Sequence, residues 1–493
     1  MGGAPWRSNG CNTCRKRKVK CDFQRPQCAR CLRGGHRCEG YERDRKFIHT
    51  FADPAPGPSD ALTVQSQAED PSFTVINVNS QIRSQLFSLF VDSYVPSLPV
   101  GQVNFRCQQG SDLFREFPSI MDGKNSQLFD RAVSALASVF VGRKVGDDGL
   151  MRHGVMLYNN AIQIFSRLIS KNGLPIQEVL SANVVFQLYE VINSTSGFAG
   201  WMAHMQGANA VVARHRKSLE RDELSKLLVR QLKLSNIFHA IGKSKSALLF
   251  CPMWRALSPT MSSDDPIDEI IDILMECTVL VEKISSSPPE SEVQRLELAC
   301  WSLRHQIQAW YRRLQGSSLG KLYTPNSDLT EVPLSPSAKS TFPHTFHFVA
   351  LDVAEAHMLC WTALLILSSF FHRIECQREY QPQAVYALSP VSEDAKSDDQ
   401  RRSEYFLQEA EFYANQICRS VGYFIKPHMN ILGGHNLLFP VSMAAKFFYG
   451  NHFDDKYQWC QEVFAVLDSI GLGLANVLQG TPWSRYKLGE VGS

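Results

Sequence analysis

The sequence lacks the features that mark a secreted or membrane-spanning protein. No apolar run that could act as a signal peptide stands near its start. The longest uncharged apolar stretch, 358–371, is shorter than the ~20 residues that span a bilayer. Beyond residue 38 the cysteines are scattered singly, as free thiols are. We therefore expect no membrane partner and a reducing compartment, where clustered cysteines bind metal more often than they form disulfides.

Enzyme signatures are missing or incomplete. Gly242-Lys243-Ser244 ends like a phosphate-binding loop, but Ile237 stands where that loop needs its first glycine. The segment Gly471-Leu472-Gly473 lacks the third glycine of a dinucleotide-binding loop. The motifs H-E-x-x-H and G-x-S-x-G do not occur. We therefore predict that the protein is not an enzyme.

Positive charge is concentrated at one end of the chain. The formal net charge is +3, yet residues 1–50 hold 13 Lys/Arg against 4 Asp/Glu, a balance of +9, and the remainder carries −6. A small basic head on a mildly acidic body is typical of a polyanion-binding module attached to a larger domain. With 493 residues, 44% of them hydrophobic, the body is long enough to bury a large core.

Six cysteines dominate that basic head, in two C-x2-C-x6-C triplets of which the second is the first shifted by 17 residues. They are Cys11, Cys14, Cys21, Cys28, Cys31 and Cys38. A closed structural zinc site needs four ligands, so two Zn²⁺ ions need eight and six thiolates fall two short. One bridging cysteine from each triplet supplies the difference. The spacing predicts a two-zinc, six-thiolate cluster, against alternative readings as disulfides or a redox site, and it leaves no need for His36 as a seventh ligand.

The segments CNTCRKRKVKC (11–21) and CARCLRGGHRC (28–38), with Pro26 in the loop between them, resemble the fungal Zn2Cys6 binuclear cluster domain. The resemblance implies that Cys11 and Cys28 are the bridges. It also implies a nuclear transcription factor for RNA polymerase II genes that binds double-stranded DNA at a CGG-like half-site, in company with the transcription machinery or co-regulators. A regulator specific to one pathway or biosynthetic cluster is a narrower form of this expectation.

A basic run lies between the second and third cysteines, on a short helix predicted from Asn12 to about Lys18. Its members are Arg15, Lys16, Arg17, Lys18 and Lys20. Such a helix can enter the major groove, where Lys or Arg pairs with guanine. By the family pattern Lys18 reads a base, Arg17 lies beside it, and Arg15 and Lys20 contact phosphates. The alternative is a solvated basic face or a nuclear-localisation run, and the latter can coexist with DNA binding.

The segments around the cluster have the composition of connecting chain. Residues 1–10 read as a flexible arm, and residues 39–79 as a second basic patch followed by a disordered linker rich in proline and polar residues. No sustained heptads occur between residues 47 and 80. The sequence is therefore compatible with a homodimer, but it shows no evident coiled coil to form one.

From residue 80 to 480 the apolar residues recur at helical spacing. One predicted stripe consists of Ile82, Leu86, Leu89 and Phe90; another runs along residues 151–169 as Met151, Val155, Tyr158, Ile162, Phe165 and Ile169. Exposed loops are predicted at about 316–343 and 378–402, and a tail at 481–493. The expected fold class is therefore a small metal-stabilised Zn2Cys6 domain, a flexible linker and a large all-α domain.

Residues 80–260 also resemble, more weakly, the regulatory region of fungal Zn2Cys6 factors. The residues that carry this resemblance are Gly142 to Lys144, Leu157, Tyr158, Ala161, Trp201, His204, Gly207, Ala208 and Trp254. It implies an all-α regulatory domain. The alternatives are a ligand receptor or enzyme with an accessory zinc cluster, and a metal-buffering or thiol-redox protein.

Overall fold

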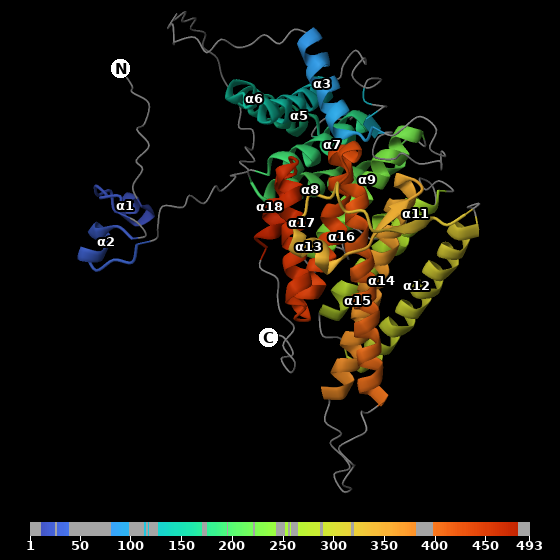
Figure 1. The fold of residues 1–493 in the computed structure, drawn as a ribbon. Helices are drawn as coiled ribbons and strands as arrows, with labels where there is room; N and C mark the ends of the chain where they lie inside the picture. Colours follow the sequence, from blue (N-terminus) through green and yellow to red (C-terminus); the bar gives the residue numbers. More distant parts are fainter. Residues whose placement is uncertain are drawn as a thin grey trace, which may run out of the picture. The chain divides into compact units, whose positions relative to one another are not determined.

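In the computed structural model the chain forms two compact units, residues 1–76 and 77–493 (Figure 1). The structure describes residues 11–24, 27–38, 80–97, 113–114, 117, 127–169, 175–194, 196–219, 222–242, 252–254, 257, 265–285, 289–316, 320–380 and 398–481. The predicted arm, the predicted linker and nearly all of the predicted tail lie outside these ranges.

The N-terminal unit contains two one-turn helices, α1 (Asn12–Lys16) and α2 (Ala29–Arg33). The first of them is the predicted helix, although α1 ends two residues earlier than expected because Lys18 adopts a left-handed backbone conformation, with φ of 53°. The buried residues described in this unit are its six cysteines, with Val19 packed against them. Sulfur therefore takes the place of a hydrophobic core.

The second unit is helical, as the sequence predicts, and the fold class is confirmed for the described residues. Its longer helices are α3 (Ser80–Tyr94), α5 (Gln127–Val145), α6 (Asp148–Leu168), α7 (Ile176–Asn193), α8 (Phe198–His215), α9 (Glu223–Gly242), α11 (Pro266–Ser285), α12 (Glu290–Gly316), α14 (Leu351–Tyr380), α15 (Asp398–Phe424), α16 (Asn430–Gly450) and α17 (Asp454–Ser469). Shorter pieces are α13 (Pro336–Thr341), α18 (Gly473–Gln479) and the 3₁₀ turns η1 (Arg216–Ser218) and η2 (Pro427–Met429). They share one hydrophobic core.

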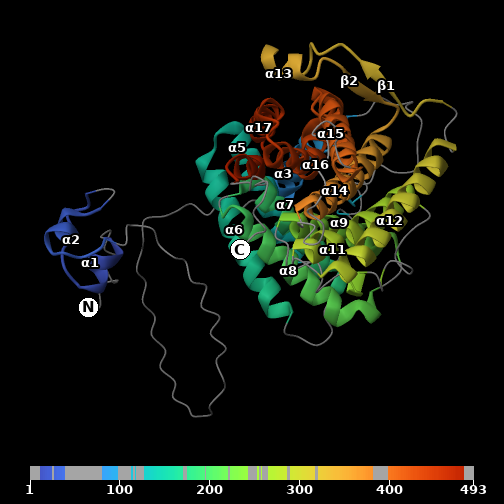
Figure 2. The ribbon, with the colours of Figure 1, turned by 90° about the horizontal axis from the view of Figure 1, so that it is seen from below.

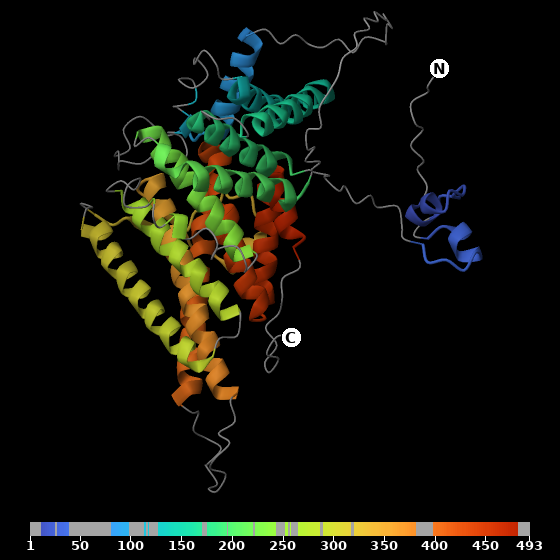
Figure 3. The same cartoon turned by 180° about the vertical axis from the view of Figure 1, so that it is seen from behind.

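Helix α14 lies near the middle of this unit and pairs side by side with α15 (Figures 1 and 3). Its segment Leu351–Cys376 is long and apolar enough to cross a membrane, but 83% of the most apolar window is buried inside the protein. Length and composition alone are weak evidence for a span, since core helices pass the same test. Its burial here agrees with the sequence, in which the uncharged apolar stretch 358–371 is too short to span a bilayer.

The prediction of an exposed loop at 316–343 is wrong for part of that segment. Strand β1 (Tyr323–Asn326) pairs antiparallel with β2 (Thr345–Phe348), and α13 lies between them along the chain, at the edge formed by α15 and α17 (Figure 2). The Tyr323 ring lies 4.8 Å from Phe346 and 5.7 Å from Trp361 of α14. Two strands of four residues are too short to produce an alternating pattern in the sequence, so only the packing against Trp361 reveals them.

The second predicted loop, 378–402, is shorter than expected. Helix α14 continues to Tyr380 and α15 begins at Asp398, while residues 381–397 lie outside the described part. The polar side chains of these helix ends remove the apolar periodicity on which the prediction rested. Near the end of the described chain, α17 and α18 are separate helices, because Gly471 adopts φ of 106° between them.

The predicted apolar stripes are only partly buried. In α3, Leu86 and Phe90 are in the core, but Leu89 is 52% exposed. In α6 the fully buried positions include Gly154 and Tyr158. Gly154 allows α6 to approach α5 closely, because a Cβ there would stand 2.9 Å from the backbone nitrogen of Val139. The inward face of α6 is therefore set partly by small residues that a hydrophobicity pattern does not register.

Candidate metal centre and nucleic-acid interface

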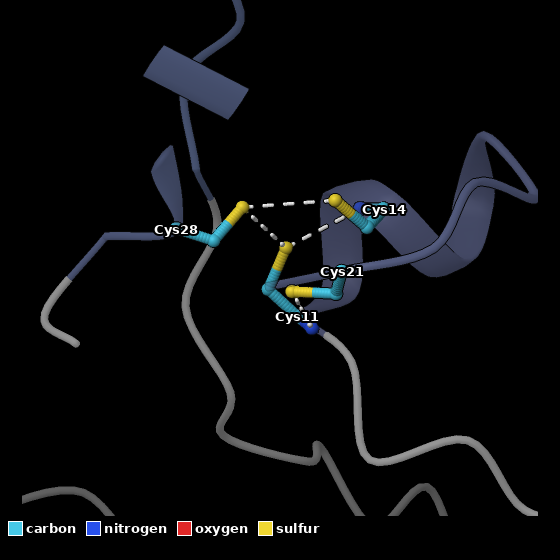
Figure 4. Close-up of side chains that lie close together, drawn as sticks. All are labelled: Cys11, Cys14, Cys21 and Cys28. Atoms are coloured by element: carbon cyan, nitrogen blue, oxygen red, sulfur yellow. Dashed lines mark hydrogen bonds between the residues drawn. The ribbon is translucent and has the colours of Figure 1, made fainter. Parts of the chain in front are cut away.

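The two cysteine triplets fold into two copies of one local structure. In the first, the backbone N–H of Cys14 donates to the Cys11 sulfur at 3.4 Å. In the second, Cys31 N–H donates to Cys28 sulfur at 3.3 Å. Figure 4 shows the sulfurs of the first triplet and of Cys28 turned toward one another. These donors, at the starts of α1 and α2, stabilise negative charge on the first sulfur of each triplet.

A second pair of hydrogen bonds closes each half. Cys11 N–H donates to the sulfur of Cys21 at 3.5 Å, and Cys28 N–H donates to that of Cys38 at 3.5 Å. The partners again differ by 17 residues, the shift seen in the sequence. The repeat in the sequence is therefore also a repeat in the backbone hydrogen bonds.

The six sulfurs form two overlapping groups of four. One contains Cys11, Cys14, Cys21 and Cys28, and the other contains Cys11, Cys28, Cys31 and Cys38. Within each group the ligand atoms lie within 4.8 Å of one another, and Cys11 and Cys28 belong to both. Each group has the four thiols that a closed zinc site uses.

The sulfur separations fit tetrahedral zinc. Zn–S bonds of about 2.3 Å in a tetrahedron place neighbouring sulfurs roughly 3.8 Å apart. The Cys11 and Cys28 sulfurs are 3.6 Å apart, those of Cys14 and Cys28 are 3.6 Å apart, and those of Cys11 and Cys31 are 3.8 Å apart. The donor set and its spacing therefore suit two zinc ions that share two thiolates.

Without a metal, the thiols of Cys11, Cys14 and Cys28 favour the protonated form. Burial raises the pKa of the Cys11, Cys14 and Cys28 thiols above its usual value. A divalent cation reverses that preference, because coordinated thiols lose their protons. His36 is exposed and belongs to neither group of four.

The predicted DNA-contacting residues lie on and just after α1. Lys16, Arg17, Lys18 and Lys20 are exposed; the side chain of Arg15 lies outside the described part. These four exposed side chains are therefore on the surface that the metal centre supports. The ends of α1 and α2 come close together, because a Cβ at Gly34 would lie 3.7 Å from Arg17 Nη1.

Lys18 occupies a special backbone position. Both one-turn helices end in a Schellman motif, in which Val19 N–H donates to Cys14 C=O at 3.0 Å and His36 N–H donates to Cys31 C=O at 2.9 Å. The left-handed residue of this motif is usually glycine. The second triplet has Gly35 there, with φ of 68°, whereas the first has Lys18. The lysine side chain is thus kept where glycine is favoured by roughly 1–2 kcal/mol.

Two polar contacts that sequence reasoning missed join the halves. Asp22 Oδ2 accepts a hydrogen bond from Arg30 N–H at 2.7 Å, at the start of α2, and Thr13 Oγ1 donates to Arg37 C=O at 3.0 Å. Asp22 directly follows the third cysteine, and an acidic residue before a short helix is a capping signal. Asp22 therefore carries a capping signal in the sequence, but the N–H that it caps belongs to Arg30, eight residues further along the chain.

In the helical unit, residues of the weaker resemblance meet in one polar network. Tyr158 Oη donates to Glu190 Oε1 at 2.6 Å and lies 2.5 Å from His204 Nε2. Burial lowers the pKa of His204 to about 4. A neutral histidine in contact with a tyrosine hydroxyl has the structural role of a core histidine and not that of a residue free to bind an effector. This network joins α6, α7 and α8.

Comparison with known proteins finds a family match for the N-terminal unit. Residues 9–47 match the family model described as the fungal Zn(2)-Cys(6) binuclear cluster domain. An aspercryptin biosynthesis cluster-specific transcription regulator of Emericella nidulans is 61% identical over 33 residues, which are 7% of this chain and 5% of that protein. An uncharacterised transcriptional regulatory protein of Schizosaccharomyces pombe is 33% identical over 89 residues, 18% of this chain and 15% of its own length. No solved structure matched the chain.

These matches agree with the geometry of the sulfurs. Residues 9–47 are a Zn2Cys6 binuclear cluster domain, which holds two zinc ions through six cysteines. The matched segments cover small fractions of the two relatives.

Proposed function

We propose that this protein is a nuclear, zinc-dependent transcription regulator that binds double-stranded DNA through its N-terminal unit and is controlled through its helical unit. Residues 1–50 carry a balance of +9 charges, and neutralising phosphates is the main source of affinity for DNA. The two relatives with matching segments are named transcription regulators.

The single observation that carries the proposal is Lys18. An exposed lysine stands at a left-handed position whose counterpart in the second triplet is Gly35. A backbone outlier of this kind points to a function for its side chain. Lys18 reads a guanine in a CGG-like half-site, Arg17 lies beside it, and Arg15, Lys16 and Lys20 contact phosphates. Cys11 and Cys28 bridge the two zinc ions that support this surface.

The helical unit has the regulatory role, through co-regulators, the transcription machinery or a second copy of the chain. The target is a set of RNA polymerase II genes, and control of one biosynthetic gene cluster is the narrower version suggested by one relative's name. The rival reading, an enzyme with an accessory zinc cluster, needs catalytic groups that converge in the helical unit, and no catalytic motif of the sequence offers them.

The test separates base reading from charge. In Lys18→Gly the left-handed backbone is relaxed, so loss of function cannot be attributed to backbone strain. This variant should lose discrimination between a CGG-containing site and scrambled DNA, by about 1–3 kcal/mol, while it keeps weak binding. Lys20→Ala should weaken binding to both DNAs alike and reduce the slope of log affinity against log salt by about one.

The assay is competition binding at two salt concentrations with the zinc-loaded full chain. Full preference for the site in Lys18→Gly would show that this lysine is not the base reader. An equal loss on both DNAs in both variants would reduce the basic run to a non-specific polyanion surface.

A further inference from the structure

The helical unit contains a partly open cavity of about 180 Å³. Its walls come from two sets of helices. The earlier helices in the sequence are α3, α7, α8, α9 and α11, and the later ones are α14, α15, α16 and α18. Elements from both ends of the unit therefore meet around one space. An apolar cavity of about 150 Å³ is large enough to bind benzene, so this one has room for a ring and a short substituent.

Aromatic rings form a continuous part of the wall. Trp201 of α8 lies 5.4 Å from Phe238 of α9, and Phe238 lies 5.5 Å from Phe439 of α16, between ring centroids. All three line the cavity. Edge-to-face and tilted rings at these separations present both faces and edges to a bound molecule. A flat apolar group is the ligand part that this wall suits.

Two hydrogen-bond acceptors also line the cavity. Gln187 of α7 is 4% exposed; its Nε2 donates to Asn183 Oδ1 at 2.8 Å, and its Oε1 has no partner in the described structure. A buried acceptor without a donor costs free energy. Glu355 of α14 accepts a hydrogen bond from Asn436 Nδ2 and also faces the cavity.

The other charged group at the cavity is already paired. Arg230 forms ion pairs with Asp265 at 3.1 Å and with Asp268 at 2.5 Å. His435 is in contact with Tyr94 Oη at 2.5 Å, and burial lowers its pKa to about 4, so it is neutral. The ionisable group that a ligand can meet is therefore the carboxyl of Glu355.

Glu355 is an unusual residue for this place. Burial, together with Asp352, raises its pKa to about 8, although Asn436 and Arg230 oppose the shift. A carboxyl in an apolar wall lowers stability, and such groups gather at functional sites. A methionine or leucine would fill the same wall without that penalty.

We propose that this cavity is a binding site for a small amine of about ten non-hydrogen atoms, whose apolar ring packs on Trp201, Phe238 and Phe439 while its amino group donates to Glu355 and Gln187. The ring matches the aromatic residues of the lining, and the amino group matches its two acceptors. Because the walls come from helices far apart in sequence, an occupant stabilises their packing by mass action. This binding stands apart from the proposed DNA function and can be tested without DNA.

The experiment uses the zinc-loaded full chain and three probes of similar size: 2-phenylethylamine, 2-phenylethanol and phenylacetate. Binding is measured by titration calorimetry and by ligand-observed NMR. The amine should bind most tightly, the alcohol more weakly, and the carboxylate not at all at the same concentration, because the cation among the lining residues, Arg230, is already paired with Asp265 and Asp268.

Two variants locate the site. Glu355→Gln keeps the shape of the side chain and the acceptor for Asn436, and it should weaken amine binding at least tenfold while changing alcohol binding little. Leu234→Trp enlarges a lining side chain and should abolish binding of both. Glu411→Gln is the matched control, since Glu411 pairs with Lys456 and lies outside the lining residues; its affinity for the amine should equal that of the wild type.

Three results would overturn the proposal: no binding of the amine to the wild type at millimolar concentration, tighter binding of phenylacetate than of the amine, or equal amine affinity in Glu355→Gln and wild type. If Leu234→Trp fails to fold, Glu355→Gln alone decides, because the glutamine is nearly isosteric and remains compatible with the packing.

Discussion

The two units of this chain have cores built from different kinds of side chain. In the zinc unit the described buried residues are six cysteines, and its large apolar side chains are outside: Phe23 is 53% exposed and Leu32 59% exposed. In the helical unit the largest side chains are inside, with Trp254 and Trp310 each 1% exposed. A segment of about 30 residues cannot bury enough apolar surface to fold, so metal bonds replace it.

The difference also decides which residues remain available for binding. In the zinc unit most described side chains other than the cysteines and Val19 can face outward, because the core consists of sulfur. In the helical unit, polar groups such as Glu355 must be placed inside among apolar neighbours to create a site. One unit therefore offers a surface, and the other offers a cavity.

The largest difference between the two units is expected when the metal is removed. Chelation of the full chain should unfold the zinc unit completely, since zinc contributes roughly 10–16 kcal/mol to small modules of this kind, and should leave the thermal unfolding of the helical unit unchanged. Metal analysis should find about two zinc ions per chain before chelation. Protease resistance of residues 11–38 after chelation, under reducing conditions, would mean that a core other than the metal holds this unit.

The reciprocal test removes a core side chain from the helical unit. Phe464 of α17 is fully buried, so Phe464→Ala should lower the free energy of unfolding of this unit by about 3–5 kcal/mol, as measured by urea denaturation. Zinc content should stay at its wild-type value. The matched control is Phe412→Ala, because Phe412 of α15 is 52% exposed and its loss should cost less than ~0.5 kcal/mol. Equal effects of the two substitutions would contradict the assignment of the core.

Glu355 provides a test that only the helical unit can show. Its pKa is raised from 4.5 to about 8 by burial and Asp352, so between these pH values the folded chain holds one proton more than the unfolded chain. Stability must then fall as pH rises, at about 1.4 kcal/mol per pH unit. Glu355→Gln does not titrate, and its stability advantage over wild type should grow from pH 5 to pH 7 in urea denaturation.

The control for that measurement is Glu411→Gln, which removes a carboxylate paired with Lys456 at the surface side of α15. Its stability difference from wild type should not grow with pH over this range. If the Glu355→Gln difference is constant between pH 5 and pH 7, the carboxyl titrates normally and the helical unit does not hold it protonated.

The smallest expected effect concerns the polar contacts of the zinc unit. Asp22 accepts the Arg30 N–H at the start of α2, so Asp22→Ala should cost about 1 kcal/mol, as loss of a helix cap does. Competition with a zinc indicator should show weaker retention of metal, and Asp22→Asn should retain most of the wild-type affinity. A loss as large as that caused by Cys28→Ala would show that hydrogen bonds contribute as much as metal bonds.

Sequence alone determined the zinc unit almost completely. Ligand spacing is a local property: Cys11 and Cys14 are held by one helical turn, and the same turn recurs at Cys28 and Cys31, so the shift of 17 residues already contains the geometry. The helical class of the second unit was likewise readable, because helical periodicity is local as well.

Tertiary structure alone decided the rest. The strand pair at Tyr323 and Phe348, the close approach at Gly154 and the cavity at Glu355 depend on residues that are distant in the chain. The left-handed conformation of Lys18 was also not predicted, because glycine is the usual residue at such a position. A local pattern reports what a segment prefers, but which groups meet, and which are left unpartnered, is set by packing between segments.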